Sequence, residues 1–479
     1  MLTIQGHPSR VCQGWSRREL IQAGGLGLFG VSLPRVLAAE EAAVPFQNGR
    51  AKQVIFLLLF GGPSQLETFD MKPEAPSEIR GPFQPIASRT PGLRICEHLS
   101  RTAQLSDKFA VIRTMNHRFN DHGSVHYIQT GHPHPSRFGP QPGETPVGPK
   151  EWPSMGSVVN YLSLNHDPDR RATMPDYTYV PNRLGALQGI NRPGQYAGWL
   201  GSAYNALATD IRKRGKTDNP YFRDCDDKEL DFRIRGILSH EEVRIDRLDR
   251  RRSLLEQFES QRRTLDDTGV VGQYDSVRGR AIALATSPKM QAALDIRRES
   301  ASLRDRYGRH LFGQSVLMGR RLLEAGSRFV TVAWDTPDGY SWDSHRSSND
   351  LKNHLIPGFD QAYSALLTDL DDRGLLDETL VVVCGEMGRT PKKYGNWGRS
   401  HWTYCFPALM AGAGIRGGVT YGTSDKQAGF PIDKPVSPEQ MSATIFHALG
   451  IDPHMRINDR QGRPVELVHN AAPVFELFS

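Results

Sequence analysis

The sequence is poor in cysteine, with five in 479 residues, and no two of them form a Cys-x-x-Cys pair. Their wide spacing gives no support for a disulfide scaffold or for a zinc module built from cysteine. The sequence also lacks a zinc finger, an RNA-recognition signature and a basic stripe interleaved with aromatic residues, so nucleic acid is not an expected partner. The net charge of +6 is mild, and its arginines concentrate between residues 212 and 321, as in a solvated helical face.

Long hydrophobic runs are absent as well, and no segment is apolar enough over its length to span a membrane. The N-terminal region instead carries Arg17 and Arg18 in SRREL, a short Gly- and Leu-rich apolar stretch, and small residues up to Ala39. This order is typical of an export signal of the twin-arginine type, with a general secretory signal or a chance arginine pair as the alternatives. We therefore expect a signal peptide over 1–39 and a mature chain over 40–479, without an integral membrane segment, in the periplasm or outside the cell.

Continuous apolar runs are the main structural signal. They occupy 53–62, 109–115, 328–334, 379–385 and 406–412; helical patterns lie between two of them at 355–376 and after the last at 437–450. Apolar strands that alternate with helices predict an α/β fold with a doubly wound, mostly parallel sheet and helices on both faces. Apolar residues at helical spacing among dense charges predict a helical insertion over about 205–320.

Polar residues gather in the loops beside these runs, and open α/β sheets bind ligands at the carboxyl ends of their strands. Carboxylates and imidazoles in such a place suit a divalent ion such as zinc, calcium or manganese. Each loop alone could equally be an ordinary polar surface loop. His132 and His134 stand beside prolines, and we expect both to be exposed. The candidates, in chain order, are Ser64, Glu67, Asp70, Asp121, His122, His126, Asp335, Asp338, Asp343, His345, Glu386, Arg389 and His401.

Seven segments carry a resemblance to a known family. They are GGPSQLETFDMKP, EIRGPFQPI, DHGSVHYIQTGHP, WDSH, GEMGRTP, GRSHW and YGTSD. With them the chain resembles the DUF1501 family, of the planctomycete type, which is assigned to the alkaline phosphatase-like/sulfatase superfamily. The resemblance covers nearly the whole mature chain. It implies an alkaline phosphatase-like fold and a metal-dependent hydrolase of sulfate or phosphate esters.

The resemblance also implies roles for individual residues. Asp343, His345 and His401 match one metal position, and Glu386 and Asp121 would contribute to the same or a second ion. A second ion lacks support, because Met387 stands where the superfamily has an imidazole, and Gly61 and Gly62 stand where its first strand ends in an acid.

The catalytic candidates are less well defined. His122 or His126 is the expected acid or base, and Arg389 the expected fork-shaped partner of the anionic ester. Asp121 falls at the nucleophile position, where the absence of cysteine excludes a formylglycine; Ser64 and Ser124 are further candidates.

The expected partner is a small-molecule or polysaccharide ester that carries negative charge. Two other functions fit the same residues. One is a non-catalytic binding protein of the cell envelope that keeps the alkaline phosphatase-like fold. The other is a phosphomutase-type transfer, which export disfavours. Fold alone does not choose among them, and the sequence predicts no oligomeric state.

Overall fold

The computed structural model describes Phe46 and residues 49–134, 148, 150–166, 174–234, 287–335 and 341–479. The predicted signal peptide and the middle of the predicted insertion, 235–286, lie outside these residues. In the part of the chain that is described, no helix is both long enough and apolar enough to cross a membrane.

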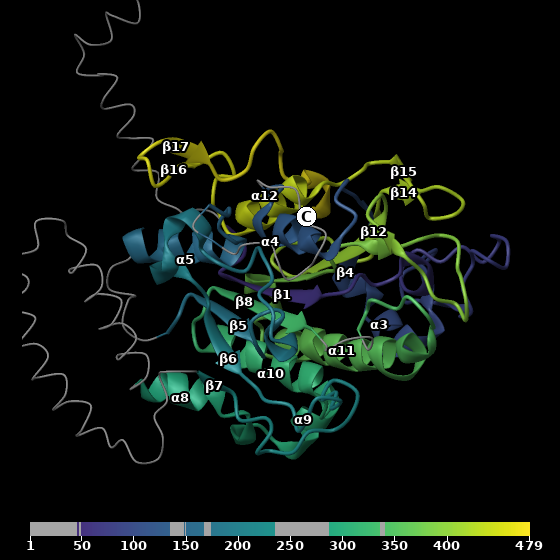
Figure 1. The fold of residues 1–479 in the computed structure, drawn as a ribbon, viewed down its shortest axis with the longest axis horizontal. Coiled ribbons are helices and arrows are strands. Elements are labelled where there is room, and N and C mark those ends of the chain that lie inside the picture. The colour runs from purple at the N-terminus through teal and green to yellow at the C-terminus, as the bar shows by residue number, and fades with distance from the viewer. Residues whose placement is uncertain are drawn as a thin grey trace, which may run out of the picture. The chain divides into compact units, whose positions relative to one another are not determined.

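A nine-stranded sheet organises the fold, in the order β13-β4-β12-β9-β1-β8-β5-β6-β7 (Figure 1). The pairings show that β12 and β7 run antiparallel to the other strands, which are all parallel to one another. The strands are β1 (Gln53–Leu59), β4 (Phe109–Met115), β5 (Tyr177–Val180), β6 (Leu207–Asp210), β7 (Arg233–Ile234), β8 (Phe329–Trp334), β9 (Thr379–Cys384), β12 (Phe406–Ala411) and β13 (Val419–Tyr421). The predicted α/β class with a mostly parallel sheet is confirmed.

Helices cover both faces of this sheet (Figure 1). One face packs against α3 (Ser100–Ala103), α8 (Pro288–Leu294), α9 (Ala301–Tyr307), α10 (Leu311–Glu324) and α11 (Ile356–Asp372). The other packs against α4 (Val125–Thr130), α5 (Met155–His166) and α12 (Pro438–Ala448). Successive side chains of a strand point to opposite faces, so β1 places Ile55, Leu57 and Leu59 in the first core and Val54, Phe56 and Leu58 in the second. This two-sided burial explains why β1 is apolar from Val54 to Leu59.

Two predictions about local structure are corrected. The described ends of the predicted helical insertion are 205–234 and 287–320; the first contributes β6 and β7 to the sheet, and only the second is helical. His132 was expected to be exposed, but it is buried, stacks on Trp152 at 3.7 Å between ring centroids, and contacts the Leu467 carbonyl at 2.8 Å through Nε2.

Short two-stranded hairpins complete the described structure. One of them, β10 (Gly388–Arg389) with β11 (His401–Trp402), lies between β9 and β12 in the chain and pairs Arg389 with His401. The others are β2 (Pro85–Ala87) with β3 (Arg94–Cys96), β14 (Thr423–Ser424) with β15 (Pro431–Asp433), and β16 (Arg456–Asn458) with β17 (Pro464–Glu466). The β10–β11 hairpin projects two candidate side chains from one small element.

Candidate metal centre

Strand direction brings the polar loops together. β1, β4, β8 and β9 are parallel, so the residues that follow them emerge at one edge of the sheet. β12 is antiparallel, so it begins at that edge, and the β10–β11 hairpin that leads into it carries His401 there. The candidate centre is thus built from four strand ends and one strand start.

Asp343 is the centre of the cluster. Its Oδ1 lies 2.9 Å from His345 Nε2 and 3.3 Å from His401 Nε2, and its Oδ2 lies 3.2 Å from His122 Nε2. Burial would raise the pKa of the Asp343 carboxyl, but hydrogen bonds from the three imidazoles and the charge of Arg389 outweigh it and hold the pKa well below its usual range. The side chains of Asp343 and His345 are 29% and 37% exposed, so the cluster is open to a ligand from solvent.

Glu386 lies behind His122. One of its carboxylate oxygens is 2.7 Å from His122 Nδ1, and both accept from the Gly61 backbone N–H at 3.0 Å. Burial opposes a charge on His122, yet its bonds to Asp343 and Glu386 raise its pKa to about 9. A buried carboxylate on one imidazole nitrogen fixes the ring so that the other nitrogen can face a metal. Glu386, predicted as a metal ligand, thus contacts the far side of the His122 ring from Asp343.

Arg389 is fully buried, and its guanidinium is already engaged. Nε donates to the Gly62 carbonyl at 3.1 Å, one terminal nitrogen donates to the Arg399 carbonyl at 3.3 Å, and the other donates to the Gly61 carbonyl and Asp343 Oδ1. A side chain held in this way cannot reach out to an anionic ester, the role predicted for it. It is a fixed positive charge that compensates Asp343.

The other two catalytic candidates lie apart from this contact network. Asp121 caps the short turn His122–Ser124 by accepting from the Gly123 N–H at 2.7 Å, and burial raises the pKa of its carboxyl. His126 is buried on α4, where Nδ1 faces the His132 carbonyl at 3.0 Å and burial lowers its pKa to about 3. Of the two histidines considered as acid or base, only His122 contacts Asp343 among the described residues.

Gly61 is required where Asp343 approaches the end of β1. Its φ of +112° is in the region that favours glycine, and a Cβ there would lie 2.5 Å from the Asp343 backbone nitrogen. Gly62, with φ +84°, would similarly meet Met387 Cγ at 2.7 Å. The two glycines at the expected position of the strand-end acid thus allow two loops to approach the end of β1, the Asp343 loop at Gly61 and the Met387 loop at Gly62.

Sequence reasoning missed Tyr394 and Arg399. The Tyr394 hydroxyl lies 3.0 Å from His345 Nδ1, and Arg399 forms a buried ion pair with Glu67, whose second oxygen also accepts from Ser64 Oγ. Glu67 and Ser64 are therefore engaged with each other and with Arg399. No local motif marks either missed residue, although the run of arginine, lysine and tyrosine in 389–399 is a cue for anion contact.

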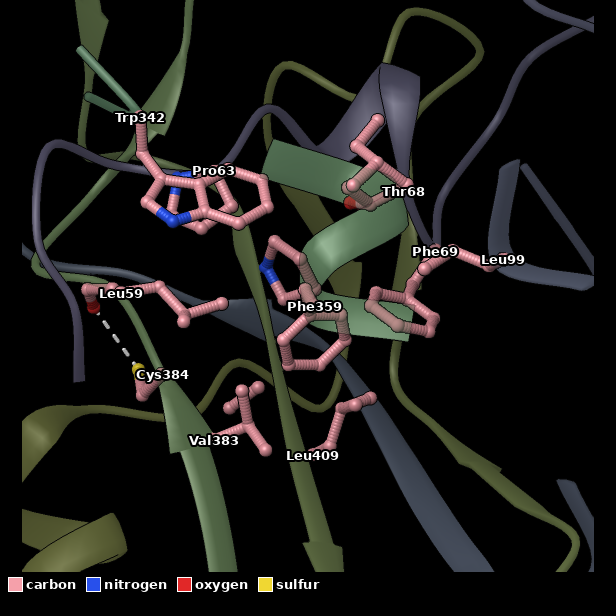
Figure 2. A pocket seen from close by; sticks show the side chains of 14 residues that line it. Leu59, Pro63, Thr68, Phe69, Leu99, Trp342, Phe359, Val383, Cys384 and Leu409 are labelled. Carbon is pink, nitrogen blue, oxygen red and sulfur yellow. Dashed lines mark hydrogen bonds between the residues drawn. The ribbon is translucent and has the colours of Figure 1, made fainter. Parts of the chain in front are cut away.

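A pocket beneath these loops is not part of the centre (Figure 2). Figure 2 shows Leu59, Trp342, Phe359 and Leu409 around it. None of its lining side chains is charged, so it offers nothing to an anionic ester or a cation.

Asp335 gives a pH-dependence prediction. Asp335 directly follows β8. One of its carboxylate oxygens accepts from the Gly185 N–H, and the other has no hydrogen-bond partner among the described residues. Burial raises the pKa of this carboxyl to about 6. Between the unfolded pKa of 3.8 and the folded value, only the folded state holds the proton, so stability falls as pH rises through that window.

We expect the wild type to lose about 3 kcal/mol relative to Asp335→Asn between pH values of about 4 and 7, measured by urea unfolding. Asp433→Asn, at an exposed position, should show the same dependence of stability on pH as the wild type. Parallel pH profiles for wild type and Asp335→Asn would contradict the assignment.

The donor set fits a single divalent ion. The ligand atoms of His122, Asp343 and His401 all lie within 4.8 Å of one another. The two imidazoles lie on different oxygens of the same carboxylate, with His122 Nε2 3.2 Å from Oδ2 and His401 Nε2 3.3 Å from Oδ1. Three protein ligands with an open position are typical of catalytic rather than structural zinc sites.

The fold and this centre define an α/β protein with a histidine–aspartate cluster at the carboxyl edge of its sheet. The family model DUF1501, described as a protein of unknown function, matches residues 51–478, and the chain belongs to that family. The predicted family is confirmed. No curated protein sequence matches the chain.

Several solved structures are similar to the chain at low identity. A protein in the alkaline phosphatase superfamily from Vibrio parahaemolyticus has 12% identity and a TM-score of 0.37, over 85% of this chain and 68% of that one. The phosphonate monoester hydrolase SpPMH from Silicibacter pomeroyi has 11% identity and a TM-score of 0.36, over 89% and 76%. A mutant of the alkaline phosphatase PafA has 9% identity and a TM-score of 0.42, over 90% and 100%.

Proposed function

We propose that the protein is a metal-dependent hydrolase of sulfate or phosphate esters. The observation that carries the proposal is the convergence of His122, Asp343 and His401 at the ligand-binding edge of the sheet, with a buried carboxylate behind one of them. A bound divalent ion would polarise an ester oxygen and lower the pKa of coordinated water toward about 7. Two imidazoles and one carboxylate suit zinc or manganese better than calcium, which prefers oxygen ligands alone.

The surrounding residues have distinct tasks in this proposal. Glu386 holds the His122 ring, and Arg389 holds Asp343 and balances its charge. His345, predicted as a further ligand, stays a candidate for the same ion, because its Nε2 lies 2.9 Å from Asp343 Oδ1 and 3.0 Å from His401 Nε2. The exposed Lys392 and the half-buried Lys393 stand in the loop that leads to His401 and supply attraction for an anionic ester.

A non-catalytic binding protein is the second candidate. Its support is Arg389, since a buried guanidinium already neutralises Asp343 and would compete with an incoming cation for the same oxygen. In this case the cluster would be a structural ion-pair network, and the protein would purify without a metal.

Metal analysis separates the two functions. We expect about one divalent ion per chain, lost on treatment with EDTA, and regained from zinc or manganese solutions together with hydrolysis of p-nitrophenyl phosphate or p-nitrophenyl sulfate. Ion at 100 times its dissociation constant should stabilise the folded chain by about 2.7 kcal/mol, measured by urea unfolding.

His401→Ala should lose the ion, whereas His447→Ala, which changes an exposed histidine on α12, should keep it. A pure, folded protein without stoichiometric metal would rule out the hydrolase and leave the binding protein.

We further propose export by the twin-arginine route, on the pattern around Arg17 and Arg18. Replacing both by lysine should keep the protein in the cytoplasm, as measured by cell fractionation. Unchanged export would point to a general secretory signal.

A further inference from the structure

His117 joins loops that carry the candidate metal centre. It lies two residues after the end of β4 and is buried, with 5% of the residue exposed. Its Nε2 lies 2.7 Å from the backbone carbonyl oxygen of Glu386, which lies two residues after the end of β9. We propose that His117 is a positioning residue of this centre, which holds Glu386 so that its carboxylate fixes the His122 ring. This inference rests on the metal-binding part of the proposed function.

The order of the strands explains why a side chain is needed there. β12 lies between β4 and β9 and runs antiparallel to both. Neighbouring strands are about 4.8 Å apart, so about 10 Å separates the carboxyl ends of β4 and β9, and backbone hydrogen bonds of the sheet cannot join them directly. The His117 ring bridges this gap beside the start of β12, where its centroid lies 5.5 Å from that of the Phe406 ring.

Both nitrogens of the His117 ring have partners that define its hydrogen atoms. The Glu386 carbonyl oxygen can only accept a hydrogen bond, so Nε2 carries the hydrogen. The Phe119 backbone N–H can only donate, so Nδ1, which lies 3.2 Å from it, is the acceptor. The ring is therefore a neutral imidazole, with its tautomer assigned from its partners. These two contacts hold the ring in one orientation.

Glu386 is held at its backbone and at the tip of its side chain. Its backbone carbonyl accepts from His117 Nε2 and, at 3.3 Å, from Ser124 Oγ. Both oxygens of its carboxylate lie 3.0 Å from the Gly61 backbone nitrogen, and one lies 2.7 Å from His122 Nδ1. A buried side chain fixed at both ends has little freedom to rotate. The His122 ring is therefore oriented by a residue that His117 keeps in place.

The backbone of His117 also reaches the segment that carries His401. Its N–H donates to the Thr403 carbonyl at 2.8 Å, and Thr403 lies two residues after His401 in the chain. His117 thus contacts segments that place two imidazoles of the centre. A substitution of His117 removes its side-chain contacts but not this backbone N–H, so the effect of a variant reports on the contact with Glu386.

Two variants separate the roles of the two ring nitrogens. In His117→Gln the amide nitrogen can reach the position of Nε2 and still donate to Glu386. In His117→Asn the shorter side chain can place its oxygen near the position of Nδ1 and accept from Phe119, but it cannot reach Glu386. Loss of a group that orients a ligand typically costs 10–100-fold in metal affinity. Because His117 acts through Glu386, we expect zinc to bind about 10-fold more weakly to His117→Asn, and within about 2-fold of the wild type to His117→Gln.

His132 provides a matched control. It is also buried, at 3% exposure, and its Nε2 also donates to a backbone carbonyl, that of Leu467, at 2.8 Å. His132→Asn should therefore destabilise the folded chain about as much as His117→Asn does, while its zinc affinity stays that of the wild type. Competition with a chromophoric chelator measures the zinc affinity of each folded protein, and urea unfolding of the metal-free proteins compares their stability.

Cobalt(II) in place of zinc gives a second measurement, because its visible absorption reports the geometry of the ligands. We expect the absorption bands to change in His117→Asn and to match those of the wild type in His117→Gln and His132→Asn. If His117→Asn keeps the zinc affinity and the cobalt spectrum of the wild type, the proposal is wrong. An equal loss of zinc affinity in His132→Asn would also overturn it, since the effect would then follow from lost stability alone.

The positioning role can also be tested without a metal. A wild-type chain that binds no divalent ion would refute the proposed function, and the hydrogen bond from His122 Nδ1–H to Glu386 can then be followed in the metal-free protein. With isotope-labelled histidine, this N–H should give a downfield proton signal in the NMR spectrum, assigned by its loss in His122→Gln. We expect the signal to disappear or to move upfield in His117→Asn and to persist in His117→Gln. An unchanged signal in His117→Asn would overturn the positioning role independently of the function.

Discussion

Asp343→Ala should abolish metal binding and destabilise the protein at the same time. The substitution removes the oxygen shared by His345, His401 and Arg389. Loss of an orienting group alone typically costs 10–100-fold in metal affinity, so we expect loss of this ligand to cost more than about 100-fold. Leaving Arg389 buried without its carboxylate should cost about 3 kcal/mol.

Metal content and urea unfolding of the metal-free protein measure the two effects separately. Asp433→Ala, at an exposed position of β15, is the matched control and should change neither. Retention of stoichiometric metal by Asp343→Ala would exclude Asp343 as a ligand, whatever its effect on stability.

Breaking the Glu67–Arg399 pair should cost about 3–5 kcal/mol, because either single replacement leaves a buried, unpaired polar or charged group. Arg399 Nε lies 3.0 Å from both oxygens of Glu67, and both side chains are 1% exposed. Arg399 also donates to the carbonyls of Ile79 and Thr390, so it joins three segments of the chain. We expect Glu67→Gln and Arg399→Met to be strongly destabilising, and the double variant to lose less than their sum.

Urea unfolding of the four proteins gives the coupling energy. The surface pair Arg456–Glu466 is the comparison: its Nη–Oε distance is also short, at 3.0 Å, but its side chains are 64% and 31% exposed. Glu466→Gln should therefore change stability by less than about 1 kcal/mol. Strict additivity for the Glu67–Arg399 pair would show that it is not energetically coupled.

The sequence predicted the sheet well because its strands are apolar on both faces. A run such as 406–412 shows that a strand is buried but not its direction, and β12 proved antiparallel. β6 and β7 were missed because they are short strands, of four and two residues, at one end of the sheet in a stretch dominated by charge. Propensity and periodicity report burial and spacing along the chain, whereas strand direction depends on pairing with residues far away in sequence.

The candidate centre was only partly predictable. Asp343 and His401 were predicted as metal ligands and His122 as an acid or base, because the loops beside the strands meet at one edge, a rule of the fold that needs no side-chain detail. The sequence could not predict that the guanidinium of Arg389 is already hydrogen-bonded, since three of its acceptors are backbone carbonyls. Tyr394 reaches His345 only because the 390–399 loop folds back on it, and that depends on Glu67, hundreds of residues earlier in the chain.

The place of β1 in the sheet has a consequence for biosynthesis. β1 is completed at Leu59, but its two neighbours, β8 and β9, begin at Phe329 and Thr379. During translation a strand that is apolar from Val54 onward therefore has both hydrogen-bonding edges unpaired until most of the chain has left the ribosome. Exposed apolar strands of this kind are prone to aggregation before their partners arrive. We expect the nascent chain to need a holding chaperone, and truncation before β9 to yield insoluble protein.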